Sequence, residues 1–126
     1  MNLISSFDPT TIEGFHAHVY YRDSPEKEIA ALIREEVQQR FDVIIGRWRD
    51  EPVGPHPQAM FQIAFESKDL GLMIPWLMSV RGPLSILVHA STGLHDRLDH
   101  STGACWLGQQ LALNLDFFEQ EEGKST

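Results

Sequence analysis

The sequence contains little cysteine, and it has no long apolar run. Its single cysteine, Cys105, excludes an internal disulfide framework and predicts a reducing, cytoplasmic compartment with a small buried thiol. The longest uncharged apolar stretch, residues 70–80, is well short of the about 20 residues that span a bilayer. Residues 1–11 lack the pattern of an export signal. We therefore expect a protein that is neither embedded in a membrane nor exported.

Positive charge is also scarce. Acidic side chains outnumber basic ones by 18 to 10, which gives a formal net charge of −8. This charge repels phosphate backbones, so nucleic acid is not an expected partner. The glycine-rich motifs GxGxxG and Walker A are missing, as are CxxC pairs, so nothing predicts a nucleotide site or a zinc ribbon. The residue type that stands out instead is histidine, of which there are six.

Two stretches of the chain have the pattern of helices. Asp23 or Ser24 is placed to cap a helix that continues to about Arg40, with apolar residues recurring at helical spacing. A second helix is predicted between residues 69 and 80, where Pro75 must either kink the helix or form its first turn. Each helix is expected to bury one apolar stripe.

Other stretches alternate between two kinds of side chain, which is the pattern of β-strands. With the helices they give the order βαββαβ, which usually folds into a ferredoxin-like α+β domain: a four-stranded antiparallel sheet of order 4-1-3-2, with both helices on one face. The alternation at residues 111–117 predicts an additional C-terminal strand or extended arm, and residues 119–126 are predicted to be a loose tail of a single domain, 1–126. The four strands are predicted at residues 15–21, 41–49, 58–65 and 84–89.

Histidines recur on one side of the predicted sheet. His16 and His18 are two residues apart on the first strand, so their imidazoles project from the same face, about 6.6 Å apart along the chain. The apolar side chains that alternate with them are expected to face the helices, which leaves the histidines on the open face. His89 of the fourth strand is predicted to share that face and to lie beside His16, because the two strands run antiparallel.

His56 lies in the loop before the third strand, between two prolines. With the third strand taken to run parallel to the first, this loop is expected at the same end of the sheet, so that four histidines converge. Clustered imidazoles repel one another when protonated, whereas neutral imidazole is a preferred ligand for iron, zinc and copper. The pattern therefore favours a divalent metal site. For His95, in the long loop after the fourth strand, we favour the simpler interpretation of a hydrogen-bonded surface or core residue that is not a ligand.

A group of short motifs spans most of the chain, from about residue 15 to residue 117. The motifs are His16-Ala-His18-Val-Tyr, Gly54-Pro-His56-Pro with Met60-Phe61-Gln62 following, Leu87-Val-His89, and Asp99-His100 followed by Trp106-Leu107-Gly108. As a group they resemble the small DOPA 4,5-dioxygenase family. The resemblance implies a compact, usually dimeric ferredoxin-like protein with a non-haem Fe(II) ion. It also implies an extradiol dioxygenase, which inserts both atoms of O₂ into a catechol and cleaves the ring beside the two hydroxyls.

The chemistry of such an enzyme assigns roles to the histidines. Fe(II) must hold a catecholate and O₂ at adjacent positions, so a few protein ligands occupy one side of the ion. We predict His16, His18 and His89 as these ligands. His56 is predicted to be the base that removes a catechol proton or the acid that returns one, since the ordinary imidazole pKa of about 6.5 suits either step. His100 is a second acid or base candidate, or a residue that supports the ligands.

Carboxylates enter the prediction in two ways. Well-known extradiol enzymes commonly use two histidines and a carboxylate, for which Glu13, Asp96 and Asp99 are the nearest candidates here. An amino-acid catechol such as DOPA also carries a carboxylate of its own. The residues predicted to bind the substrate are Arg47, Arg49 and Gln62, and the other interpretation of the two arginines is that they protect an exposed strand edge.

Two other functions stay open at this point. The chain is also compatible with a non-enzymatic metal-binding module, or with a dimeric domain whose histidines line a ligand pocket without metal. A homodimer is predicted, because an open sheet face that carries Tyr20, Met60 and Leu87, together with the alternating arm at residues 111–117, offers apolar surface that a chain this small would need to cover.

Overall fold

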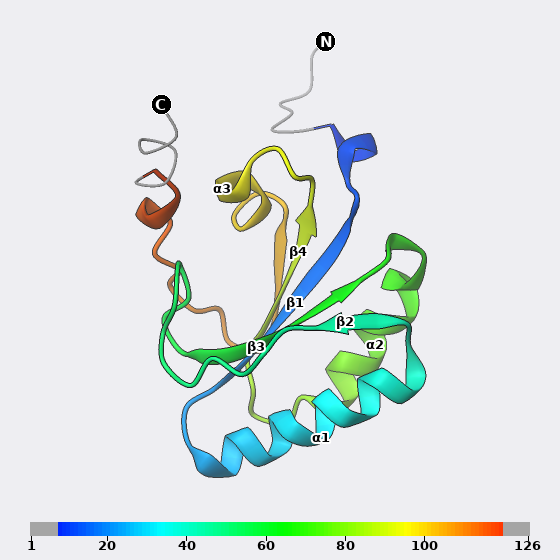
Figure 1. The fold of residues 1–126 in the computed structure, drawn as a ribbon, viewed down its shortest axis with the longest axis vertical. Coiled ribbons are helices and arrows are strands. Elements are labelled where there is room, and N and C mark those ends of the chain that lie inside the picture. Colours follow the sequence, from blue (N-terminus) through cyan, green and yellow to red (C-terminus); the bar gives the residue numbers. More distant parts are fainter. Residues whose placement is uncertain (1–7, 120–126) are drawn as a thin grey trace.

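The computed structural model describes residues 8–119, and these form an antiparallel sheet of order β2-β3-β1-β4-β5 with two long helices on one face (Figure 1). This arrangement confirms the predicted ferredoxin-like fold with an extra strand. Within the described part of the chain, no helix is long and apolar enough to cross a bilayer. The elements are η1 (Pro9–Thr11), β1 (Gly14–Tyr21), α1 (Ser24–Arg40), β2 (Val43–Ile45), β3 (Ala59–Phe65), η2 (Ser67–Asp69), α2 (Leu70–Val80), β4 (Ile86–Ser91), α3 (Asp96–Asp99) and β5 (Ala104–Leu107).

Local signals set the ends of the long helices. The Asp23 carboxylate accepts a hydrogen bond from the backbone N–H of Glu26 at 3.0 Å, which satisfies one of the free donors in the first turn of α1. The prediction of this cap is therefore confirmed. Helix α2 occupies the predicted stretch, and Pro75 lies inside it rather than in its first turn.

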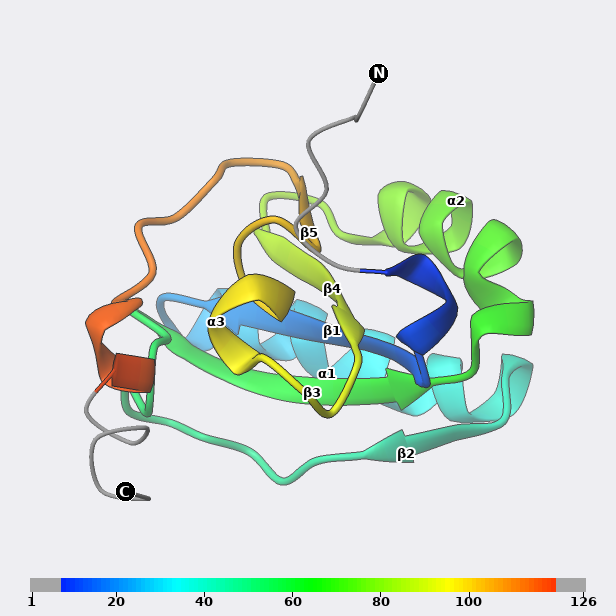
Figure 2. The same ribbon diagram turned by 90° about the horizontal axis from the view of Figure 1, so that it is seen from above.

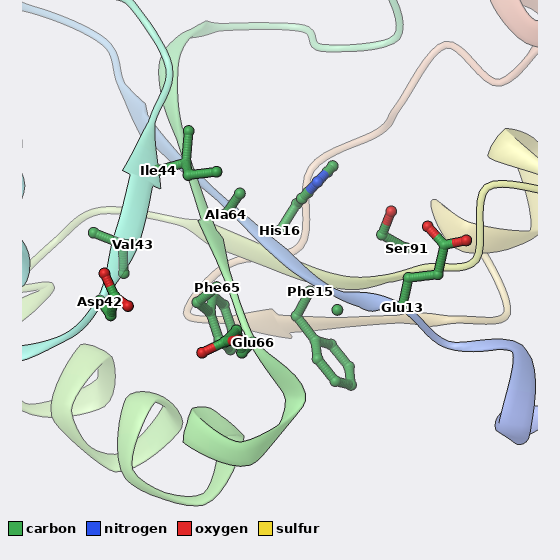
Figure 3. Close-up of a pocket in the computed structure, with 11 residues that line it drawn as sticks. Glu13, Phe15, His16, Asp42, Val43, Ile44, Ala64, Phe65, Glu66 and Ser91 are labelled. Atoms are coloured by element: carbon green, nitrogen blue, oxygen red, sulfur yellow. The ribbon is translucent and has the colours of Figure 1, made fainter.

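The face of the sheet that meets the helices is apolar throughout. Phe15 and Phe65, on neighbouring strands, stack with ring centroids 5.8 Å apart, on the side of the sheet opposite His16 (Figure 3). Strand alternation places every second residue on this side, as predicted. Side chains from β1, β3, β4, β5, both helices and the turn before β4 fill this main core, namely Ala17, Val19, Tyr21, Ala30, Ile33, Val37, Phe61, Ile63, Phe65, Met73, Leu77, Leu84, Ile86, Val88 and Leu107.

The outer parts of the sheet differ from the prediction. The second strand was expected over residues 41–49, but β2 spans only Val43–Ile45, and one isolated bridge pairs Arg49 with Met60. The extra strand is β5, which pairs with β4, and residues 111–117 form an arm without strand pairing. Cys105 lies on β5, where its side chain is exposed, so the prediction of a buried thiol was wrong.

The arm covers part of the sheet face opposite the helices. Tyr20, Met60 and Leu87 form a second small core there, packed against Trp106 and other residues of β5 and the arm. These residues were predicted to be open to a partner chain, but their own chain buries them, so that argument for a dimer does not hold. Of the predicted loose tail, residues 120–126 lie outside the described residues.

The arm also holds the loop between β2 and β3. Figure 2 shows the C-terminal segment leaving β5 and passing across to this loop. The backbone N–H of Asn114 donates to the carbonyl of Pro55 at 2.9 Å. Gly54 has φ of +59°, which favours glycine at this turn, and it lies beside the ring of Phe117 in the arm. The loop is thereby folded back over the sheet.

Candidate metal and substrate site

Five of the six histidines gather on the sheet face opposite the helices. His18 and His89 are almost fully buried, with 3% and 2% of their surface exposed, and their ring centroids lie 5.1 Å apart. His16 lies at the same distance from His89, as the predicted pairing of β1 with β4 requires. His56 and His100 complete the cluster, with ring centroids 4.2 Å and 5.9 Å from that of His18. The sixth histidine, His95, is exposed at the start of α3, as expected.

His56 reaches the cluster from the opposite end to the one predicted. Strand β3 runs antiparallel to β1, not parallel, and Ala59 at the start of β3 pairs with Tyr21 at the end of β1. The loop that carries His56 therefore lies at the Tyr20 end of β1, away from His16. Because the loop folds back over the sheet, the His56 imidazole still contacts His18, and the predicted convergence holds.

The cluster contains two overlapping groups of possible metal ligands. One consists of His16, His18 and His89, and the other of His18, His56 and His100; within each group the three ligand atoms lie within 4.8 Å of one another. The first group is the set predicted from strand alternation. The second is a finding of the structure, because it depends on where the loops place His56 and His100.

Hydrogen bonds test whether the first group suits a metal ion. His89 Nδ1 lies 2.9 Å from the carbonyl oxygen of Ala90, which can only accept, so Nδ1 carries the proton and Nε2 keeps a lone pair. The Nε2 atoms of His18 and His89 are 3.0 Å apart, close to the separation of two nitrogens that each lie about 2.1 Å from one ion at neighbouring positions. Buried His18 Nδ1 has no hydrogen-bond partner among the described residues. The donor set therefore fits a divalent transition-metal ion.

Burial keeps the cluster neutral. The pKa of His56 falls to about 4 and that of His89 to about 3, in both cases mainly because the charged imidazole loses its hydration and secondly because His100 is close. Burial likewise lowers the pKa values of His16, His18 and His100. Neutral imidazoles keep the lone pairs that a metal ion or a proton can take.

The predicted carboxylate candidates lie outside both groups of ligands. Asp99 is 3% exposed, and its carboxylate accepts hydrogen bonds from the backbone N–H and the hydroxyl of Thr92, each at 3.0 Å. These bonds close the loop that leads to His100, and Asp99 belongs to neither group of ligands. Among the described residues, neither Glu13 nor Asp96 has a carboxylate oxygen in either group.

A cavity of about 510 Å³ opens beside the cluster. Four histidines line it, and the predicted substrate residues Arg47, Arg49 and Gln62 line it as well. Both arginines are exposed at the cavity, while Gln62 is half-buried on β3. Volumes of this order suit a small aromatic ligand. Asp96 is the acidic residue that lines this cavity. A neighbouring hollow of about 400 Å³, shown in Figure 3, shares His16 and is lined by three acidic residues, Glu13, Asp42 and Glu66.

Tyr20 is the site residue that the sequence analysis missed as such. Its hydroxyl lies 2.7 Å from Nδ1 of His56, and the residue is 1% exposed. One signal was present in the sequence, because Tyr20 continues the alternation of His16 and His18 on the same face of β1. Its contact with His56 depends on the path of the loop.

Comparison with known proteins places this chain in a family. The model of the Dopa 4,5-dioxygenase family matches residues 15–117. A DOPA 4,5-dioxygenase from Amanita muscaria is 33% identical over 112 residues, which cover 82% of this chain and 49% of the relative. An uncharacterized 21.2 kDa protein from Botryotinia fuckeliana is 36% identical over 117 residues, covering 85% and 64%. The chain thus spans about half to two thirds of the length of these relatives.

A solved structure shares both the fold and the sequence. The crystal structure of a proposed dioxygenase from Nostoc punctiforme superimposes with a TM-score of 0.86 at 46% identity. The match covers 92% of this chain and 99% of that one. At this identity the likeness extends beyond the fold to the sequence.

Proposed function

The chain belongs to the Dopa 4,5-dioxygenase family, and on that premise we propose that it opens the ring of a catechol with O₂ at a non-haem Fe(II) centre, by extradiol cleavage. The observation that supports this proposal most directly is the gathering of five neutral imidazoles beside a cavity of about 510 Å³. A cluster of buried histidines costs hydration energy, and a bound metal ion offsets that cost.

In this proposal His16, His18 and His89 hold the ion. The choice is supported by the 3.0 Å separation of the His18 and His89 Nε2 atoms and by the bond that fixes the His89 tautomer. An Fe(II) ion held by these three residues would supply Lewis-acid and redox chemistry to a catechol and O₂.

His56 and His100 are the residues that interact with the protons of the catechol. Both line the cavity, and the pKa of each is lowered by burial, so each is neutral at physiological pH. A neutral imidazole can accept a proton at one nitrogen and donate a hydrogen bond from the other. The two residues therefore have the chemistry that deprotonation and orientation of a catechol require.

Arg47 and Arg49, with Gln62, hold the carboxylate of an amino-acid catechol. A guanidinium group binds a carboxylate through two parallel hydrogen bonds, which fixes the position of the ring relative to the histidines. DOPA is the substrate named for the relative from Amanita muscaria, and we propose the same substrate class here.

The proposal also concerns the domain organisation, the oligomeric state and the location of the protein. We propose that residues 1–126 form one domain and that the protein acts as a homodimer in the cytoplasm. Apolar side chains that the chain leaves exposed, including Ile44 at the edge strand β2 and Leu72 on α2, are available to a partner. Sedimentation at micromolar concentration should give a dimer mass, and a monomer mass would contradict this part of the proposal.

Anaerobic loading with Fe(II), followed by DOPA and then O₂, tests the activity. The expected result is consumption of O₂ in step with a yellow semialdehyde product, and protein loaded with Zn(II) is the control because Zn(II) has no redox chemistry. Tight iron binding without turnover of any catechol would instead support the non-enzymatic metal-binding module.

Variants then separate the proposed roles. His56→Ala should keep its iron and lose about 10²–10⁴-fold in turnover. Arg49→Gln and Arg47→Gln should raise KM for DOPA by about 10–100-fold, the usual value of a charged hydrogen bond, and leave KM for unsubstituted catechol nearly unchanged. Equal effects on DOPA and catechol would show that the arginines do not bind the carboxylate.

A further inference from the structure

The hydroxyl of Tyr20 has one hydrogen-bond partner among the described residues, Nδ1 of His56 at 2.7 Å. The phenol is 1% exposed, so a hydroxyl that only accepted would leave its own proton buried without a partner. The hydroxyl therefore donates, and His56 Nδ1 accepts. Burial raises the pKa of Tyr20, which agrees with a phenol that keeps its proton.

This bond decides which nitrogen of His56 carries hydrogen. A neutral imidazole has one N–H, and when Nδ1 accepts a hydrogen bond the proton sits on Nε2. His56 thus offers a hydrogen-bond donor from Nε2. With its proton on Nε2, the ring has no lone pair there for a metal ion or for a substrate proton.

His100 is held in the opposite tautomer. Its Nδ1 lies 2.8 Å from the backbone carbonyl of Asp96, which can only accept, so Nδ1 carries the proton and Nε2 keeps its lone pair. The ring centroids of His56 and His100 are 6.0 Å apart, and both residues line the same cavity. One ring therefore offers a donor and the other an acceptor.

We propose that Tyr20 is a positioning residue that keeps the proton of His56 on Nε2, so that His56 donates a hydrogen bond to the substrate while His100 Nε2 accepts its proton. The catalytic meaning rests on the proposed function: the O–H bond of one catechol hydroxyl breaks, and its proton forms an N–H bond with His100. His56 keeps its proton and stabilises the negative charge on a substrate oxygen. The tautomers themselves are properties of the metal-free protein.

Two-bond ¹H–¹⁵N correlation spectra of the metal-free protein test the tautomers, because they distinguish a nitrogen that carries hydrogen from a bare one. The His56 signals are identified by their loss in His56→Ala. We expect hydrogen on Nε2 of His56 in the wild type and a substantial population of the Nδ1–H form in Tyr20→Phe. Hydrogen on Nδ1 of His56 in the wild type, or an unchanged tautomer in Tyr20→Phe, would overturn the proposal.

Tyr21→Phe is the matched control. It removes a hydroxyl from the neighbouring tyrosine, which donates to the Asp50 carboxylate at 2.7 Å and faces the other side of the sheet. We expect this variant to leave the His56 tautomer unchanged. A change equal to that in Tyr20→Phe would mean that the loss of any buried hydroxyl disturbs the site, and would contradict a specific role for Tyr20.

Rescue experiments test the two roles in the iron-loaded enzyme. His56→Gln keeps an N–H donor and should be at least about tenfold more active than His56→Ala, whereas His100→Gln, whose amide does not take a proton, should recover nothing relative to His100→Ala. The opposite pattern would exchange the two roles and refute the proposal. If the spectra show the expected tautomers but neither the wild type nor any variant turns over a catechol, the proposed function fails and the tautomer assignment stands.

Discussion

The two faces of the sheet are built from the same strands but hold opposite chemistry. Against the helices, β1 places Ala17 and Val19 in an apolar core. On the other face, the same strand places His16 and His18 in the histidine cluster, and the hydroxyl of Tyr20 contacts His56. Apolar burial stabilises the fold by about 25 cal/mol per Å², whereas burial of imidazoles lowers their pKa values and stabilises nothing by itself. Stability is therefore expected to depend mainly on one face and chemistry on the other.

Loss of a ligand from the histidine face should give the largest change in function. Loss of a residue that only hydrogen-bonds to a metal ligand lowers metal affinity by about 10–100-fold. His89→Ala removes a ligand itself, so we expect a larger loss of iron affinity and no turnover. Metal analysis of the purified variant measures this. The control is His95→Ala, which changes an exposed histidine and should keep its iron. Normal iron in His89→Ala would favour the group His18, His56 and His100 as the ligand set.

Substitutions on the face that meets the helices should lower the stability of the fold instead. Phe61 is fully buried and packs against Trp48 with ring centroids 5.1 Å apart. Phe61→Ala is expected to lower the free energy of unfolding by about 3–5 kcal/mol, through lost burial and the cavity left behind. Urea denaturation measures the change, with Phe61→Leu as a milder control. A cost below about 1 kcal/mol would mean that the core does not depend on this face as described.

Acid should destabilise the metal-free protein through the histidine face. The pKa of His56 is about 4 in the folded protein and near 6.5 in the unfolded chain, so below pH 6.5 the unfolded chain binds a proton that the folded one does not. The free energy of unfolding is therefore unaffected by His56 above about pH 6.5. It falls as the pH drops toward 4, by about 3 kcal/mol at most for this residue. Denaturation of chelator-treated protein at several pH values measures this loss. His56→Gln should show a shallower decline, and an equal decline would contradict the assignment.

The smallest effect is expected at the end of a helix on the other face of the sheet. Asp23→Ala removes the side chain that caps α1 and should cost about 1 kcal/mol of unfolding free energy. Asp23→Asn retains a capping oxygen and should cost less. Both variants should bind as much iron as the wild type. A loss of iron in Asp23→Ala would show that the two faces are not independent.

The site was predictable where it depends on the period of a strand. Two residues of a β-strand that are two apart always share a face, so His16 and His18 could be placed together without knowledge of the fold. The order βαββαβ then brought His89 beside His16, and the register of β1 with β4 confirms that pair. The prediction that the His56 loop lies at the His16 end of β1 was wrong. The helical crossover makes β2 parallel to β1, and the chain reverses after β2, so β3 runs antiparallel to β1.

The remaining features depend on contacts between distant segments. The bond between Tyr20 and His56 exists because the loop between β2 and β3 folds back, and a contact with Asn114 of the arm holds it there. His100 faces the cluster because Asp99 and Thr92 close the loop that precedes it. No local pattern encodes these contacts, since each joins residues whose separation in space is set by the whole fold.

Local periodicity is enough to predict the ferredoxin-like order of elements, the apolar and polar faces of the strands, and the histidines that share a strand face. The loop residues that complete the cluster and the burial of Tyr20 by its own chain follow only from the three-dimensional fold. The same holds for the proton of His56, because a proton in a buried site goes where its hydrogen-bond partners require, and Tyr20 comes from a distant part of the chain.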